Sequence, residues 1–199
     1  MAHARRRGTG AAPIIRRVPA ALDLLLSPVS EDQFFRDHWE RGPLHVERHD
    51  AEHFALLFSV ADLPQVIAEA AQAMRRQPPH EAPIIEIIGP AGASGDVAAS
   101  PTVAAVYEAF ESGSTVRLNQ LPLYWPPLRS YVRRLESELG FMVGVSGYCA
   151  PGGGRGAGAH FDEHDTAVVQ IAGSKRWRFG PGPVLPLETV PLLDRKSVV

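Results

Sequence analysis

The residues best suited to chemistry lie in the stretch AHFDEHD, residues 159–165, which contains two histidines and three carboxylates within seven residues. It follows the glycine-rich run PGGGRGAG and leads directly into the apolar segment TAVVQIAG. If AHFD is extended, successive side chains alternate between faces, so His160 and Asp162 project to the same side. An imidazole and a carboxylate at this spacing can bind one cation. The alternative is a charged surface loop, because such triplets also arise by chance.

Two imidazoles and one carboxylate on one face of an octahedron are the protein ligands of non-heme Fe(II) oxygenases. His160 and Asp162 would supply two of these three ligands. His164 is a poor candidate for the third, because at about 3.3 Å per residue its Cα would lie about 13 Å from that of His160. We expect His164 to lie in a loop, or to contact one of the metal-binding side chains without binding the metal itself. The remaining clustered histidines read as ordinary surface or packing residues: His38, His45, His49 and His53.

A lysine follows in the segment KRWRF, fifteen residues after His160. Strand alternation would place Lys175, Trp177 and Phe179 on one face and Arg176 and Arg178 on the other. A lysine between large apolar neighbours is costly to bury as a cation unless it meets an anion. Lys175 could therefore form a salt bridge to the distal carboxylate of a dicarboxylate cosubstrate that chelates the metal at its other end. The alternative is an edge-strand lysine whose charged head extends into water.

The elements that would position these residues are helices first and short strands afterwards. Helical periodicity and capping signals predict helices at residues 31–39 and 62–76, one capped by Ser100-Pro101, and one from Pro126-Pro127 to a glycine cap at Gly140. Strands are expected at 44–48 and 84–88. From residue 141 onward short β segments dominate, and they include AHFD, TAVVQIAG and KRWRF.

Composition restricts the functional classes. The chain has 199 residues, is 45% hydrophobic and carries a formal net charge of -2, so no overall field favours nucleic acid or an anionic membrane. The arginines near the N-terminus read as part of a solvated tail, and no apolar run is long enough to span a bilayer. Cys149 is the single cysteine, which excludes an intrachain disulfide. We expect a cytoplasmic protein with no direct nucleic-acid or membrane partner.

The same region resembles the JmjC-type cupin dioxygenases, in the bacterial branch related to the ribosomal oxygenases. The resemblance is strongest in GYCAPGGGRGAGAHFDEHDTAVVQIAGSKRWRFG, and it extends upstream through FFRDHWERGPLHV, STVRLNQL and YWPPLRSYVRRLESELG, covering roughly residues 30–180. Departures are Ser146-Gly147, where many relatives have Asn-Ala, and GGGRG, which replaces PGSxG. The family's third ligand is a histidine beyond the lysine, whereas His164 is the last histidine of this chain.

The resemblance implies a site and a fold. Members use Fe(II), 2-oxoglutarate and O2 to hydroxylate a side chain. By position, His160 and Asp162 would bind the iron, Lys175 would bind the far carboxylate of 2-oxoglutarate, and Tyr148 would line the cosubstrate pocket. The implied fold class is α+β, with a helical N-terminal part packed on an incomplete double-stranded β-helix of the cupin (jelly-roll) type.

The expected domain organisation has three parts. Residues 1–29 would be a flexible basic segment, and residues 30–193 a JmjC/cupin-type domain with a helical lead-in at 30–140 and the first half of the barrel at 141–193. Residues 194–199 would be a non-native tail, because DRKSVV can be encoded by a widely used sequencing-adaptor sequence. The hypothesis is that the reading frame enters adaptor sequence near Leu193 or Asp194, before the third histidine.

Two functional classes remain open. The first is a hydroxylase acting on a protein or peptide side chain, with ribosomal proteins among the candidate substrates. The second is a non-catalytic JmjC-like binding module, or an inactive fragment lacking the third iron ligand. Exposed strand edges would favour self-association, including a homodimer.

Overall fold

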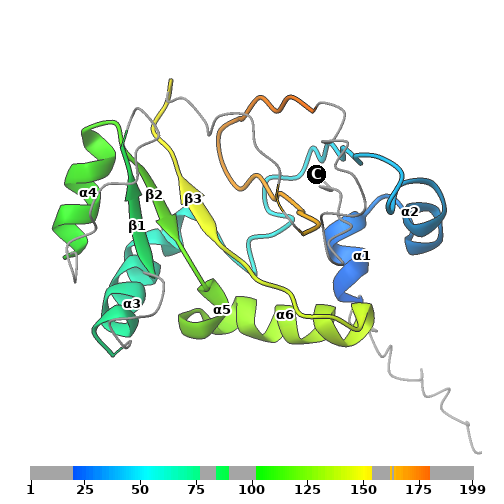
Figure 1. Cartoon of the computed structure of the whole chain (residues 1–199), viewed down its shortest axis with the longest axis horizontal. Helices are drawn as coiled ribbons and strands as arrows, with labels where there is room; N and C mark the ends of the chain where they lie inside the picture. Colours follow the sequence, from blue (N-terminus) through cyan, green and yellow to red (C-terminus); the bar gives the residue numbers. More distant parts are fainter. Residues whose placement is uncertain (1–19, 77–83, 90–101, 154–161, 163, 180–199) are drawn as a thin grey trace, which may run out of the picture.

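The computed structural model describes residues 20–76, 84–89, 102–153, 162 and 164–179, and these form helices around a small antiparallel sheet (Figure 1). The helices are α1 (Ala21–Leu26), α2 (Glu31–Asp37), the 3-10 turn η1 (Val60–Asp62), α3 (Leu63–Arg76), α4 (Val103–Glu111), α5 (Leu121–Tyr124) and α6 (Pro126–Leu139). The strands are β1 (Ile85–Ile88), β2 (Thr115–Leu118) and β3 (Gly147–Cys149). None of the helices in these ranges is long and apolar enough to cross a membrane.

The sheet has β2 at its centre, paired antiparallel with β1 on one side and β3 on the other. Ile85, Val116 and Leu118 are fully buried on one face, where α3 and α4 cover them. Figure 1 shows these two helices beside β1 and β2, with α5 and α6 running below the sheet. One face of the sheet is therefore packed against helices, and the alternate residues of each strand project from the other face.

A second apolar cluster joins α1 and α2 to α6. Glu138 of α6 accepts hydrogen bonds from the first backbone N–H groups of α1, at 2.8 Å from Ala21 N and 2.7 Å from Leu22 N. The hydroxyl of Tyr131 donates to the Ala21 carbonyl at 2.9 Å. The expected flexible segment 1–29 is thus wrong for residues 20–29, because α6 anchors α1. Residues 1–19 lie outside the described part of the chain.

The predicted helices are confirmed with small corrections at their ends. The first ends at Asp37, two residues before the expected end, while α3 and α6 match the predicted ranges closely. Gly140 caps α6 with a φ of 78°, a left-handed conformation that glycine adopts at little cost. The N-cap of α4 is Thr102, whose hydroxyl accepts from Ala105 N at 3.1 Å. Ser100 and Pro101, the expected cap, lie outside the described residues.

The strand predictions succeed only where a partner strand is present. The strand expected at 84–88 is confirmed as β1. The one expected at 44–48 is wrong, because this segment pairs with none of the described strands. The Arg48 guanidinium instead donates to the carbonyls of Leu25, in α1, and Ser27, at its end. The central strand β2 was not predicted. The α+β class is confirmed, with three antiparallel strands among the described residues.

Candidate functional site

The exposed face of the sheet carries a row of polar side chains, one from each strand. Glu86 of β1 is the register partner of Arg117 of β2, and Arg117 is the register partner of Tyr148 of β3. Directly paired residues project from the same face of a sheet. Side chains alternate along β2, so Arg117 projects from one face of the sheet while its neighbours Val116 and Leu118 project from the helix-covered face.

Arg117 is held between its two strand neighbours. Its Nη1 lies 3.3 Å from Oε2 of Glu86, and the Glu86 side chain is only 19% exposed. On the other side, the centre of its guanidinium lies 5.4 Å from the centroid of the Tyr148 ring, within the range of a cation–π contact. The Arg117 Nε is shielded from water and has no hydrogen-bond partner within the described ranges.

Lys175 also lies over the Tyr148 ring. Its Nζ is 5.7 Å from the ring centroid, although 27 residues separate the two along the chain. Burial raises the pKa of the Cys149 thiol next to Tyr148, and the positive charge of Lys175 partly offsets this rise. The structure therefore brings Tyr148 and Lys175 together, as a shared site requires, and it adds Arg117.

The two expected metal ligands are only partly covered by the structure. Asp162 is described and half-buried, whereas His160 lies outside the described residues. His164 is exposed. Among the residues placed by the structure, no group of three or more His, Cys, Asp and Glu side chains is arranged to hold a metal ion. The assignment of His160 and Asp162 to a metal therefore remains a prediction from the sequence.

The β segments expected after residue 160 are not strands where the structure describes them. Residues 166–173 and 175–179, TAVVQIAG and KRWRF, have no regular secondary structure. Trp177 and Phe179 are 48% and 53% exposed, so their rings are not packed in a core. A strand forms when its backbone groups pair with a neighbour, and none of the described strands pairs with these segments. AHFD lies largely outside the described residues.

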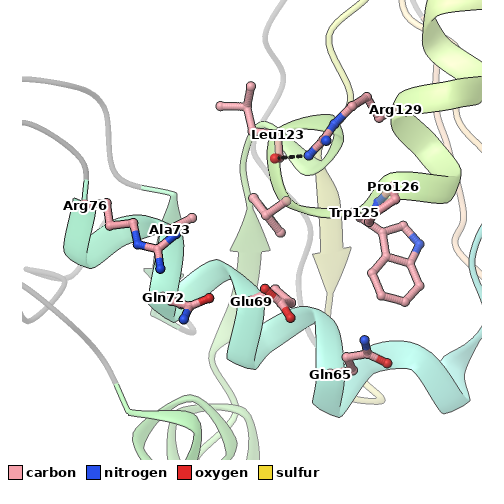
Figure 2. Close-up of a pocket in the computed structure, with 10 residues that line it drawn as sticks. Gln65, Glu69, Gln72, Ala73, Arg76, Leu123, Trp125, Pro126 and Arg129 are labelled. Carbon is pink, nitrogen blue, oxygen red and sulfur yellow. Dashed lines mark hydrogen bonds between the residues drawn. The ribbon is translucent and has the colours of Figure 1, made fainter.

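A separate hollow of about 330 Å³ lies between α3 and the corner formed by α5 and α6 (Figure 2). Gln65, Glu69 and Gln72 of α3 line one side. On the other side Arg129 donates to the Pro122 and Leu123 carbonyls. This hollow includes none of the residues of the polar row, so it is distinct from the candidate site.

Glu86 and Arg117 are the residues that sequence reasoning missed. Arg117 stands in TVRL, where apolar and polar residues alternate, and this pattern is typical of a half-buried strand. Glu86 is a single acidic residue inside the apolar run IIEII. A carboxylate within an otherwise buried strand calls for a partner, and Arg117 is that partner.

Comparison with known proteins shows which family the chain is similar to. A model of the JmjC domain matches residues 126–196. Ribosomal oxygenase 1 of Gallus gallus is 29% identical over 83% of the chain, and the bifunctional lysine-specific demethylase and histidyl-hydroxylase NO66 of Drosophila willistoni is 27% identical over 88%. The chain is therefore similar to JmjC-domain proteins, and the match to the domain itself is confined to residues 126–196. Ribosomal oxygenase 2 of Rattus norvegicus is 27% identical over 87% of the chain.

The JmjC match includes the expected site residues Tyr148, His160, Asp162 and Lys175. Arg117 and Glu86 precede it. The chain covers 27%, 22% and 36% of the length of the chicken, fly and rat relatives, respectively. The similarity thus concerns one region of considerably longer proteins.

Proposed function

We propose that the chain forms part of an Fe(II)- and 2-oxoglutarate-dependent oxygenase that hydroxylates a side chain of a protein. The observation that carries this proposal is the convergence of Lys175 and Arg117 on the ring of Tyr148. Two of these residues, Tyr148 and Lys175, are those that the JmjC pattern assigns to the cosubstrate. The match of residues 126–196 to the JmjC domain supports the same reaction class.

The residues around Tyr148 suit a dicarboxylate. The Lys175 ammonium is a compact cation with three N–H donors, which can bind a carboxylate oxygen. The Tyr148 ring, which is 50% exposed, offers an aromatic surface against which the short carbon chain of 2-oxoglutarate could lie. In this proposal Lys175 binds the distal carboxylate and Tyr148 lines the pocket.

His160 and Asp162 are proposed as two of the iron ligands. An imidazole nitrogen and a carboxylate oxygen are donors that suit Fe(II), and open coordination positions leave room for the cosubstrate. When bound, iron would supply the activation of O2, which no amino-acid side chain can provide. The third protein ligand is unassigned. The contribution of the chain is to hold the metal and the cosubstrate in a fixed relative position.

The finer features of the fold are part of the same proposal. We infer that β3 and the segments around Asp162 and Lys175 belong to a double-stranded β-helix of the cupin type. The antiparallel pairing of β2 and β3 is compatible with such a barrel. Self-association through open strand edges, including a homodimer, and a cytoplasmic location are further parts of the proposal, since Cys149 is the single cysteine.

A protein substrate is favoured by the names of the relatives. They include ribosomal oxygenases and a histidyl-hydroxylase that is also a lysine-specific demethylase. A ribosomal protein is therefore the first candidate. The second candidate function is a non-catalytic JmjC-like binding module, which would need no third iron ligand.

Succinate production separates the two candidates. The protein should be supplied with Fe(II), ascorbate, 2-oxoglutarate and a ribosomal-protein extract. We expect succinate to form in the unsubstituted protein and to be lost in His160→Ala and in Asp162→Ala, because each removes a metal donor. A protein that binds neither iron nor 2-oxoglutarate would leave the binding module as the function.

A further inference from the structure

The row of polar residues on the sheet contains a carboxylate for which the proposed chemistry has no use. Glu86 lies on β1, two strands away from Tyr148, and the side chain between them is Arg117. Its charge could not bind an anionic cosubstrate directly, because like charges repel. The question is therefore what a largely buried carboxylate does beside a cationic site.

We propose that Glu86 is a positioning residue, which acts through Arg117 to fix the ring of Tyr148 and thereby the ammonium of Lys175. The expected effect on cosubstrate binding rests on the proposed function. The expected effect on the orientation of the Tyr148 ring does not depend on that function.

The first step is the restraint of Arg117. An arginine side chain has many rotamers, and ordering it costs conformational entropy. Glu86 offsets this cost with an ion pair at 3.3 Å, in which the arginine side chain is 37% exposed. If the guanidinium swung away from the sheet, it would lose this ion pair, and the half-buried Glu86 carboxylate would be left without it.

The second step is the transfer of this restraint to Tyr148. A half-exposed ring on a three-residue strand has little packing of its own. The guanidinium at 5.4 Å from the ring centroid favours the rotamer that places the ring under the cation. Because Lys175 Nζ contacts the same ring at 5.7 Å, the position of the ring also determines where the ammonium can lie.

The charge of Glu86 alone would have the opposite effect on the affinity for a dianion. If Glu86 acted only through its charge, its removal would make the site more positive and would strengthen the binding of a dianion. If Glu86 acts by positioning, its removal weakens the binding. Glu86→Gln separates these two effects, because it removes the charge, which alone would tighten binding, and also weakens the charge-assisted contact that holds Arg117, which would loosen binding.

The first arm of the experiment needs no cosubstrate. The 199-residue chain is labelled with 3-fluorotyrosine, and the resonance of Tyr148 among the four tyrosines is assigned from its loss in Tyr148→Phe. We expect Glu86→Gln and Arg117→Lys each to shift or broaden the Tyr148 resonance, while the buried Tyr124 and Tyr131 stay unchanged. Asp37→Asn, which removes the ion pair of Arg36 on α2, is the matched control and should leave Tyr148 unchanged. An unchanged Tyr148 resonance in Glu86→Gln would overturn the positioning role.

The second arm measures 2-oxoglutarate binding by calorimetry with Mn(II) in place of Fe(II). Glu86→Gln should raise the dissociation constant about 2- to 5-fold, the equivalent of a cation–π contact of about 0.5 to 1 kcal/mol. In a Tyr148→Ala background the same substitution should no longer weaken binding, because the restraint then has nothing to act on and only the strengthening effect of charge removal remains. Tighter binding in Glu86→Gln would overturn the inference. If the unsubstituted chain bound no 2-oxoglutarate, the proposed function would fail, and the fluorine resonance would still decide the role of Glu86.

Discussion

The charge of Lys175 gives the most direct test of the proposed cosubstrate site. Lys175→Met replaces the ammonium with an uncharged thioether of similar length. The substitution removes the partner of the distal carboxylate but leaves the proposed metal ligands His160 and Asp162 unsubstituted. We therefore expect the dissociation constant of 2-oxoglutarate to rise while metal binding persists.

The exposure of Lys175 sets the magnitude. A hydrogen bond to a charged group contributes about 1.5 to 3 kcal/mol, but water and salt screen an exposed ion pair. The Lys175 side chain is exposed, with its Nζ 5.7 Å from the centroid of the Tyr148 ring. The lower end of the range therefore applies, and because about 1.4 kcal/mol corresponds to tenfold, we expect a rise of about 10-fold and no more than about 100-fold.

The assay is a calorimetric titration of 2-oxoglutarate into the protein with Mn(II), at low and at high salt. Arg176→Met is the matched control, because Arg176 is also exposed and is the next residue along the chain. Its effect should stay within about 2-fold, as expected for a surface cation without a specific partner. The reasoning is refuted if Lys175→Met leaves the affinity unchanged, or if Arg176→Met weakens binding equally.

Three further predictions concern the parts of the fold that support the site. Glu138→Gln should lower the free energy of unfolding in urea by about 0.3 to 1 kcal/mol, because the negative charge at the start of α1 is lost from an exposed side chain. Glu111→Gln, at another exposed residue, should have little effect. Burial raises the pKa of Tyr131 to about 12, so the folded state holds the phenol proton more tightly than the unfolded state does. The stability of the fold should therefore fall as the pH rises above about 10, the pKa of an unfolded tyrosine. Tyr131→Phe should reduce that fall in melting curves. Because its pKa is raised by burial, Cys149 should react with iodoacetamide at pH 8 more slowly than a free cysteine does, and faster in urea; equal rates would contradict its burial.

The helices were predictable because their determinants are local. The apolar positions of α3 recur at helical spacing, and Val66, Ile67 and Ala70 are indeed buried. Gly140 ends α6 through its own backbone conformation. The helix α1 has no such signal, since six residues are too few to be stable alone. It forms because Glu138 and Tyr131, more than 100 residues away, bind its first turn.

The site could be predicted only in part, because the strand register depends on residues far apart in the sequence. Local spacing suggests that His160 and Asp162 share a face, and the family pattern adds Tyr148 and Lys175. Neither indicates that Glu86 lies opposite Arg117, 31 residues later, or that Arg117 lies opposite Tyr148. The register of two antiparallel pairings brings these three side chains together on one face. The same dependence on neighbours explains why KRWRF has strand alternation but no strand structure, since a period of two gives a segment two faces but not a hydrogen-bonded partner.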